Sequence, residues 1–305
     1  WAGYSFWFKK LPNSFGENRN RKFIAVRAFE ERFLKRPELI LVNDRLTYSD
    51  RVTLLGQLTF FKQDFYKTNY VLGFGRTEDV PYGYRVSFTG GWERELNKER
   101  PYTGAELNWS TVNKNGTFYT YIVKLGNYWS EEVIEDAMAQ FGISRYSRIY
   151  LLGKTKIRHQ AEINFASQIK HGQKRLLDIR DANGIQGFRP DSLLGTTRLA
   201  FRSETVLFTP WKLAGFHFAP VTRIDLAYLA KENQTLFRKQ NFFSGFSAAL
   251  RARNENLIFN TVEARVYYYP RTVEVLEPWR FEFRANLRIK YPTNLITAPA
   301  TVYDP

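Results

Sequence analysis

Cysteine is absent from this chain of 305 residues. Its absence excludes a disulfide framework and any metal site built on thiolates. The sequence also has no apolar run approaching the roughly 20 residues that a membrane-spanning helix needs. A helical membrane protein is therefore excluded, while the hydrophobic content of 44% and the mean hydropathy of −0.43 are ordinary values that decide nothing further.

Histidine is scarce, and the three that are present, His159, His171 and His217, form no HxH or HExxH pattern. A GxSxG elbow and a phosphate-binding loop of the Walker type are also missing. We therefore expect no enzyme activity, no catalytic residue, no bound metal and no cofactor. The alternative is a hydrolase that assembles its residues from adjacent strands, for which His217 beside the strand of Ser203 is the starting point.

The last strand-like run, residues 279–291, alternates apolar and polar residues without a break. Side chains on a strand have a period of two, so the two sets point to opposite faces. One face carries Trp279, Phe281, Phe283, Ala285, Leu287, Ile289 and Tyr291. The other carries Arg280, Glu282, Arg284, Asn286, Arg288 and Lys290. An apolar face with aromatic ends opposite a charged face is typical of a barrel wall between lipid and a polar lumen.

Segments with this period recur along the whole chain and predict about fourteen strands, which makes the expected fold an all-β, transmembrane, antiparallel β-barrel. The predicted strands span residues 2–9, 22–33, 51–62, 67–75, 83–94, 102–111, 116–126, 132–150, 154–169, 195–208, 214–229, 242–253, 256–270 and 278–291. The stretch 131–141 also fits a helix face, and we interpret it as a strand. On composition alone, a soluble all-β enzyme stays open.

Positive charge is in excess, because 45 lysines and arginines accompany only 30 aspartates and glutamates, for a net charge of +15. Such an excess would ordinarily raise nucleic acid as a partner. Here the basic residues are spread through alternating strands and form no dense helix or arm, so we expect no nucleic-acid partner. They fit a basic lumen, solvated loops and a rim that contacts the phosphates of anionic lipids or lipopolysaccharide.

Connections in the last third of the chain alternate in length, as expected when one side of a membrane carries short turns and the other long loops. The tight ones are residues 152–153, 209–213 and 253–256, and the long ones are 170–194 and 231–241. No domain linker or short repeat interrupts the rhythm of strands. We expect a single barrel domain over residues 1–305, which includes the loop 170–194 and a proline-containing tail at 292–305.

The long connection contains, in order, Asn183, Gly184, Ile185, Gln186, Gly187, Phe188, Arg189 and Pro190. This run resembles the [VI]RG[FY] signature of the BamA and two-partner-secretion transporter superfamily, in which the loop folds back into the barrel. Five predicted strands follow it, as in that family, and Asp225 lies where the family keeps an aspartate. Gln186 occupies the family's arginine position, so the usual ion pair cannot form, and Arg189 is the alternative source of charge. Residues 74–83 resemble a periplasmic turn of some Gram-negative members.

The resemblance implies a barrel of about 14–16 strands in the outer membrane of a Gram-negative bacterium, with an inward-folded extracellular loop and a role in the insertion or translocation of proteins. The loop motif comprises Gly184, Ile185, Gln186, Gly187, Phe188 and Arg189. The residues expected to receive it inside the lumen are Asp225, Glu204, Arg202 and Arg223. The chain resembles the subgroup without N-terminal POTRA domains, unless such an extension was cut away.

Two other functions stay open. A passive, anion-preferring channel or porin is favoured by the basic lumen, and a non-catalytic accessory barrel in a larger outer-membrane complex is favoured by the missing domains and the altered arginine position. The expected partners are outer-membrane lipids and lipopolysaccharide. Client or accessory proteins of the outer membrane or periplasm are expected as well, bound through the tail or the periplasmic turns.

Overall fold

The computed structural model describes residues 1–7, 20–35, 48–71, 73–96, 98–131, 133–172, 174–190, 192–231, 238–254, 261–273, 277–285 and 295–303. Its first strands are β1 (Ala2–Trp7), β2 (Arg21–Glu31), β3 (Arg51–Asn69), β4 (Thr77–Glu95), β5 (Lys98–Val112), β6 (Phe118–Ser130), β7 (Val133–Tyr146) and β8 (Tyr150–Leu152). The others are β9 (Thr155–Ile169), β10 (Thr197–Phe208), β11 (Lys212–Leu213), β12 (Phe216–Ala230), β13 (Phe242–Asn254), β14 (Val262–Tyr268) and β15 (Trp279–Arg284). Two short 3-10 helices are η1 (Asp181–Asn183) and η2 (Lys239–Asn241).

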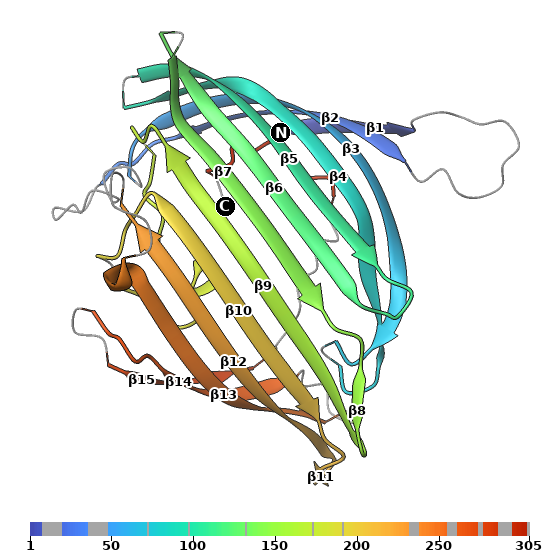
Figure 1. Cartoon of the computed structure of the whole chain (residues 1–305). Helices are drawn as coiled ribbons and strands as arrows, with labels where there is room; N and C mark the ends of the chain where they lie inside the picture. Colours follow the sequence, from blue (N-terminus) through green and yellow to red (C-terminus); the bar gives the residue numbers. More distant parts are fainter. Residues whose placement is uncertain are drawn as a thin grey trace, which may run out of the picture.

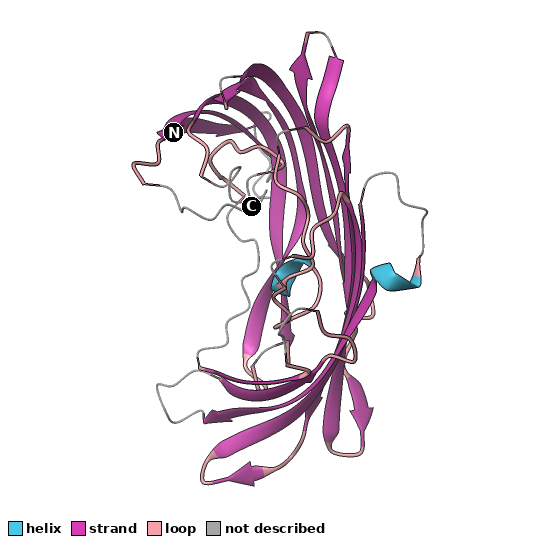
Figure 2. Ribbon diagram, turned by 90° about the vertical axis from the view of Figure 1, so that its left-hand side faces the viewer, coloured by secondary structure: helices cyan, strands magenta, loops and turns pink. Residues whose placement is uncertain are grey.

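All fifteen described strands belong to one antiparallel sheet. Neighbours in the sheet follow the order of the chain, and the short strands β8 and β11 extend hairpins beside β9 and β12. The sheet curves around a concave side, and chain segments occupy that side (Figures 1 and 2). The prediction of an all-β antiparallel fold is confirmed. Among the described residues, no helix is long and apolar enough to cross a membrane.

The convex face of the sheet exposes large apolar side chains from one end to the other. Examples along successive strands are Ile24, Leu54, Phe88, Trp109, Leu125, Phe141, Ile163, Ile224, Phe246, Val266 and Phe281. Ile224 is 43% exposed and Phe281 is 68% exposed. Because strand side chains alternate, the residues between them point to the concave side, and many are charged and buried there. Apolar groups thus lie outside and charges inside, the reverse of a soluble domain.

The described sheet begins with β1 and ends with β15. Apart from β8 and β11, which only extend hairpins, these two are its shortest strands. In the described part of the chain, β1 pairs only with β2, and β15 pairs only with β14. Each end strand has 6 residues, whereas β3 and β4 have 19. The outer edges of β1 and β15 are therefore the places where backbone N–H and C=O groups lack a neighbouring strand in the described sheet.

The prediction of two separate strands at 51–62 and 67–75 is wrong, because β3 runs without interruption from Arg51 to Asn69. The expected turn at 74–83 is also misplaced, since the chain reverses at 70–76 and β4 begins at Thr77. Gly83 lies within β4 at φ +137°, and a Cβ there would collide with the carbonyl oxygen of Lys62.

Within the stretch 131–141, residues 133–141 are a strand, as we interpreted it, and form the first part of β7. A β-bulge interrupts this strand. Gly126 of β6 faces Met138, whereas Tyr128 faces Glu135, so β7 carries an extra residue at this point. Asp136 within the bulge has φ +45°, and the alternation of faces is interrupted there. The predicted strand 132–150 also divides, because β7 ends at Tyr146 and β8 starts at Tyr150.

The last two strands are shorter in the described structure than predicted. β15 covers Trp279–Arg284, with its aromatic residues exposed and its charged residues half-buried, as the alternation predicted. The rest of the predicted strand, from residue 286 onward, lies outside the described residues. Residues 255–260, which include the second half of the expected turn at 253–256 and the start of the predicted strand 256–270, also lie outside them, whereas residues 253 and 254 belong to β13.

Candidate functional site

The connection between β9 and β10 folds onto the concave side of the sheet (Figure 2). Backbone hydrogen bonds hold this loop together: the Leu177 N–H donates to the Gly195 carbonyl at 2.8 Å, and the Ile185 N–H donates to the Ile179 carbonyl at 2.9 Å. These bonds close the loop into a compact unit, with η1 near its tip. The glycine-containing motif therefore lies at a defined place on the inner wall.

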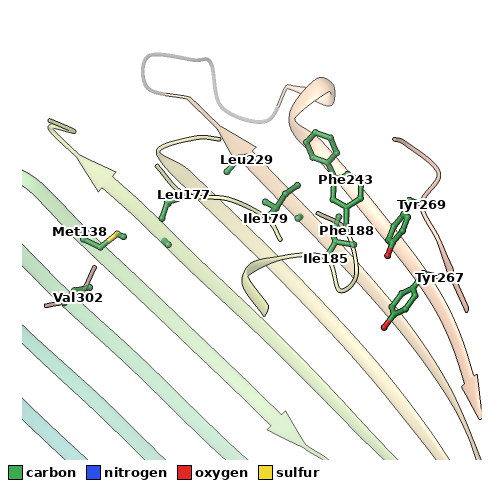
Figure 3. Packing of buried hydrophobic residues seen from close by; sticks show 12 residues of the cluster. Met138, Leu177, Ile179, Ile185, Phe188, Leu229, Phe243, Tyr267, Tyr269 and Val302 are labelled. Atoms are coloured by element: carbon green, nitrogen blue, oxygen red, sulfur yellow. The ribbon is translucent and has the colours of Figure 1, made fainter. Parts of the chain in front are cut away.

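The tip of the loop is packed tightly against the wall. Ile185 and Phe188 are 1% and 2% exposed, and the Phe188 ring lies 5.3 Å from the ring of Tyr269 and 6.1 Å from that of Phe243 (Figure 3). Gly187 has φ +75°, and a Cβ there would lie 2.5 Å from the Tyr269 hydroxyl. Glycine is required at this position by both the backbone conformation and the close approach of the wall.

Asp225 on β12 receives the loop. Its Oδ2 accepts a hydrogen bond from the Gln186 backbone N–H at 3.1 Å, and the carboxylate also accepts one from Arg223 Nε at 2.8 Å. Asp225 is 2% exposed. Gln186 thus contacts Asp225 through its backbone, so the side chain at the family's arginine position is not needed for this contact. The positive charge beside Asp225 comes from its own strand.

The expected pairing of Arg189 with Asp225 is wrong. Arg189 Nε instead forms an ion pair of 2.6 Å with Asp181 of η1. Asp181 also accepts hydrogen bonds from the Gly187 N–H at 2.9 Å and from the Gln186 side chain at 3.4 Å. The partner of Arg189 is therefore a carboxylate of the loop itself and not the aspartate of the wall.

The other three wall residues expected to receive the loop behave differently from one another. Arg202 Nε donates to the Gly184 carbonyl at 3.3 Å, so Arg202 does contact the motif. Arg223 pairs with Asp225 and contributes through that carboxylate. Glu204 forms ion pairs with wall arginines, at 2.6 Å to Arg251 and 3.2 Å to Arg265. The expectation that Glu204 docks the loop is therefore corrected: it belongs to a charge network in the wall.

Two further wall residues bind the motif and were not singled out from the sequence. Arg280 on β15 donates to the Gly187 carbonyl at 2.7 Å, and the Tyr269 hydroxyl donates to the Gln186 carbonyl at 3.0 Å. Alternation in the sequence already placed Arg280 on the inner face. The alternation gave no signal that Arg280 binds the Gly187 carbonyl, because Arg280 and Gly187 are far apart in the chain.

The beginning of the loop has its own anchor, at the bulge of β7. Asp136 accepts a hydrogen bond from the Gly172 N–H at 2.7 Å and pairs with Arg100 at 2.6 Å. Lys174 lies between two carboxylates, with its Nζ 2.5 Å from Glu93 and 2.7 Å from Glu95. The charged side chains of this anchor are all buried. Asp136 in an irregular strand and Lys174 in a loop gave no sequence signal for this arrangement.

Asp178 fixes the middle of the loop. Its carboxylate accepts hydrogen bonds from the Arg180 side chain at 2.8 Å and from the Asn183 amide at 3.2 Å, while its carbonyl accepts one from Arg198 at 2.8 Å. Burial alone would raise the pKa of Asp178, but these hydrogen bonds and the charge of Arg180 outweigh burial and lower the pKa. The carboxylate is therefore held in its ionised form within the loop.

The turn between β3 and β4, residues 70–76, also folds inward. Phe74 packs against Phe208 with ring centroids 5.4 Å apart, and Tyr70 lies 5.2 Å from the same ring. Arg158 is 3% exposed and donates to the Asn69 and Tyr70 carbonyls at 2.7 and 3.1 Å. The turn from one half of the sheet thus contacts β10 in the other half, which requires strong curvature of the wall.

The suggested histidine and serine pair is not assembled. Ser203 on β10 faces Ile224 of β12, seven positions along that strand from His217. At about 3.3 Å per residue, this separation is roughly 23 Å. His217 instead pairs in register with Arg253, and the His159 ring contacts the Thr205 hydroxyl at 3.0 Å.

No protein-family model matches the chain, and no curated protein sequence matches it either. Among solved structures, it is similar to the crystal structure of the beta domain of the Bordetella autotransporter Brka. The two chains are 13% identical, with a TM-score of 0.31, and the similarity covers 79% of this chain and 93% of the other.

Proposed function

We propose that this protein is an outer-membrane β-barrel related to the BamA and two-partner-secretion superfamily, and that it acts in the insertion or translocation of proteins without enzymatic chemistry. The observation that carries the proposal is the docked loop. Its glycine-containing tip binds Asp225 from inside the wall, and five strands of the continuous sheet follow it. This combination agrees with the arrangement that the sequence motif implies.

The convex face supports a membrane location. Large apolar side chains cover it from β2 to β15, and a contiguous exposed apolar surface of this extent is unfavourable in water. In a bilayer the same surface faces lipid, while the inward charges are shielded by the loop and by one another. Basic side chains in the connections would then contact the phosphates of lipids and lipopolysaccharide.

The two sheet ends support a role in insertion. Unpaired backbone groups cost several kcal/mol each in hydrocarbon, so an incoming strand gains free energy by pairing with such an edge. In the described structure, β1 and β15 each have a single partner strand and are short. Client or accessory proteins of the outer membrane would meet the barrel at these edges.

The segments on the concave side favour insertion or translocation of proteins over a passive channel. The loop tip and the turn at 70–76 both fill space that a porin would leave to water. A porin instead keeps an open lumen and derives selectivity from the charges that line it. The partly occupied interior therefore favours a barrel whose passage is gated.

The experiment is a folding assay in lipid vesicles that contain the purified protein. A small outer-membrane barrel protein is added in its urea-unfolded form, and its folding is followed by the shift in gel mobility of the unheated sample. We expect faster folding than in empty vesicles, and slower folding when Asp225→Ala replaces the wild type. Equal rates in empty, wild-type and variant vesicles would contradict an insertion function.

A further inference from the structure

The C-terminal tail, residues 295–303, lies on the inner wall formed by β2 to β7. Two wall side chains hold its backbone: Arg27 donates to the Pro299 carbonyl at 3.1 Å, and the Tyr102 hydroxyl accepts from the Val302 N–H at 2.9 Å. In addition, the Tyr303 hydroxyl donates to the Asp136 carbonyl. The backbone contacts recognise any extended peptide at these positions, whatever its side chains.

Apolar contacts position the tail at both of its ends. Leu295 and Ile296 pack against the buried cluster of Phe23, Ala25 and Phe61. At the other end, Val302 is 5% exposed and lies beside Met138 (Figure 3). The wall thus provides two apolar sites, joined by a polar stretch in which Arg85 donates to the Thr297 hydroxyl at 3.0 Å.

The tail and the wall differ sharply in charge. Residues 295–303 include no acidic or basic side chain. Near Tyr303, the buried charges already have partners: Arg100 of the wall is paired with Asp136, and Lys174 of the loop is paired with Glu93. An acidic or basic peptide side chain would be buried there beside charges that already have partners, which is unfavourable. The site therefore suits an uncharged segment.

The tail crosses the strands and adds no strand to the sheet. Its described residues contain no β-strand, and its hydrogen bonds are made to four different strands, β2, β4, β5 and β7. Because the sheet's own backbone ladder is complete without it, the tail can leave without breaking strand pairing.

We infer that the inner wall of β2 to β7 is a binding site for an extended, uncharged polypeptide segment, and that the tail is its resident occupant. A second segment of the same chemistry displaces the tail and takes its contacts. The identity of that second segment as part of a client protein rests on the proposed function, whereas the site itself does not.

Displacement of the tail would remove contacts from the loop 170–194. Val302 and Leu177 belong to the same buried cluster, and Lys174 at the start of the loop lies 6.0 Å from the ring of Tyr303. Removal of the tail therefore takes away packing partners from the first half of the loop. Peptide binding on one side of the lumen is in this way linked to the segment that fills the other side.

The absence of cysteine makes the site directly testable. In a Val302→Cys variant, a water-soluble maleimide should react slowly, and an excess of a synthetic peptide with the sequence of residues 295–303 should raise the rate at least about tenfold, because labelling follows the population of the released tail. A shuffled peptide should have no effect. A Val221→Cys variant, buried at 1% but far from the tail, should label equally with and without peptide.

A second test uses crosslinking, so that it does not depend on the rate of maleimide labelling. Met138→Cys with Val302→Cys should be joined by a short thiol crosslinker, while Phe141→Cys with Val302→Cys should not, because Phe141 lies on the convex face of the same strand. Failure of the first pair to crosslink, fast labelling of the Val302→Cys variant without peptide, or no acceleration with peptide would each overturn the inference.

The crosslinked protein also separates this inference from the proposed function. In the vesicle folding assay, the crosslink should lower the acceleration that the uncrosslinked variant provides. An unchanged acceleration would refute a client role for the site and leave the proposed function intact. Absence of any acceleration by the wild type would refute the proposed function, while the labelling experiment would still decide whether the wall binds a peptide.

Discussion

At the residue scale, the docked loop depends on a few polar contacts that are shielded from water. Asp225 joins the Gln186 backbone to the wall and also compensates the charge of Arg223. The Gln186 side chain, in contrast, contacts Asp181 within the loop, at 3.4 Å. The carboxylate on the wall therefore matters more for docking than the side chain at the motif position.

We predict that Asp225→Ala loosens the loop more than Gln186→Ala does. Loss of the carboxylate leaves the Gln186 backbone N–H unsatisfied and removes the nearer ion-pair partner of Arg223, which keeps only Glu204 at 3.7 Å. We expect a cost of about 1–3 kcal/mol. Gln186→Ala keeps the N–H bond and should change stability by less than about 0.5 kcal/mol. Protease cleavage within the loop measures the difference. Equal and negligible changes in cleavage would count against docking.

We predict that Gly187→Ala destabilises the loop through both strain and a clash. The residue has φ +75°, and the added Cβ would displace the Tyr269 hydroxyl from its bond to the Gln186 carbonyl. Gly153→Ala is the matched control, since its φ is +59° but nothing lies within 4 Å of the added Cβ. Thermal unfolding should show a larger loss for Gly187→Ala. Equal losses would mean that only backbone strain matters.

At the scale of elements, neighbouring strands are joined on the inner face by paired charges. Glu263 on β14 accepts from Arg251 on β13 at 2.5 Å and from Arg265 at 2.8 Å, and Glu204 on β10 pairs with the same two arginines. Buried charges are tolerated only when such partners are present. The network therefore ties β10, β13 and β14 together beneath the loop.

We predict that Glu263→Gln lowers stability by about 3–5 kcal/mol, because it leaves two buried arginines with insufficient negative charge. Glu30→Gln removes the exposed pair with Arg32 and should cost less than about 1 kcal/mol. Urea unfolding followed by tryptophan fluorescence compares the two variants. A loss at Glu263 no greater than that at Glu30 would show that the inner network does not stabilise the wall.

The sequence predicted strands well where one face is apolar and the other charged, and poorly where both faces are polar. β15 follows its predicted faces, whereas the prediction divided β3, which continues through the largely polar residues 62–69. The loop motif and Asp225 were singled out through the resemblance to a family signature and the order of its parts. Tyr269, Arg280 and the anchor at Asp136 were not found, because contacts between distant residues leave no periodic signal in one sequence.

At the scale of the whole molecule, the curved sheet presents an apolar convex face and a charged, filled concave face. The position of a residue along its strand should then determine how much a charged substitution on the convex face destabilises the protein. Near the centre of a bilayer such a charge is expensive, whereas near the interface it is not.

We predict that Ile224→Arg, near the middle of β12, costs about 2–4 kcal/mol in lipid vesicles, whereas Leu213→Arg, beside the turn that precedes β12, costs at most about 1 kcal/mol. Both native side chains are exposed and apolar, at 43% and 72%. Folding yield into vesicles at increasing urea concentration measures both costs. Equal, small costs would contradict contact between the convex face and lipid.

The central claim is that the loop closes the lumen of a membrane barrel, and conductance in a planar bilayer tests it most directly. Wild-type protein is compared with a deletion of Gly184–Pro190, which removes the tip that binds Asp225. The account predicts small, flickering current for the wild type and a large, steady pore for the deletion. Steady, anion-selective current of equal size from both proteins would contradict it and identify a passive channel.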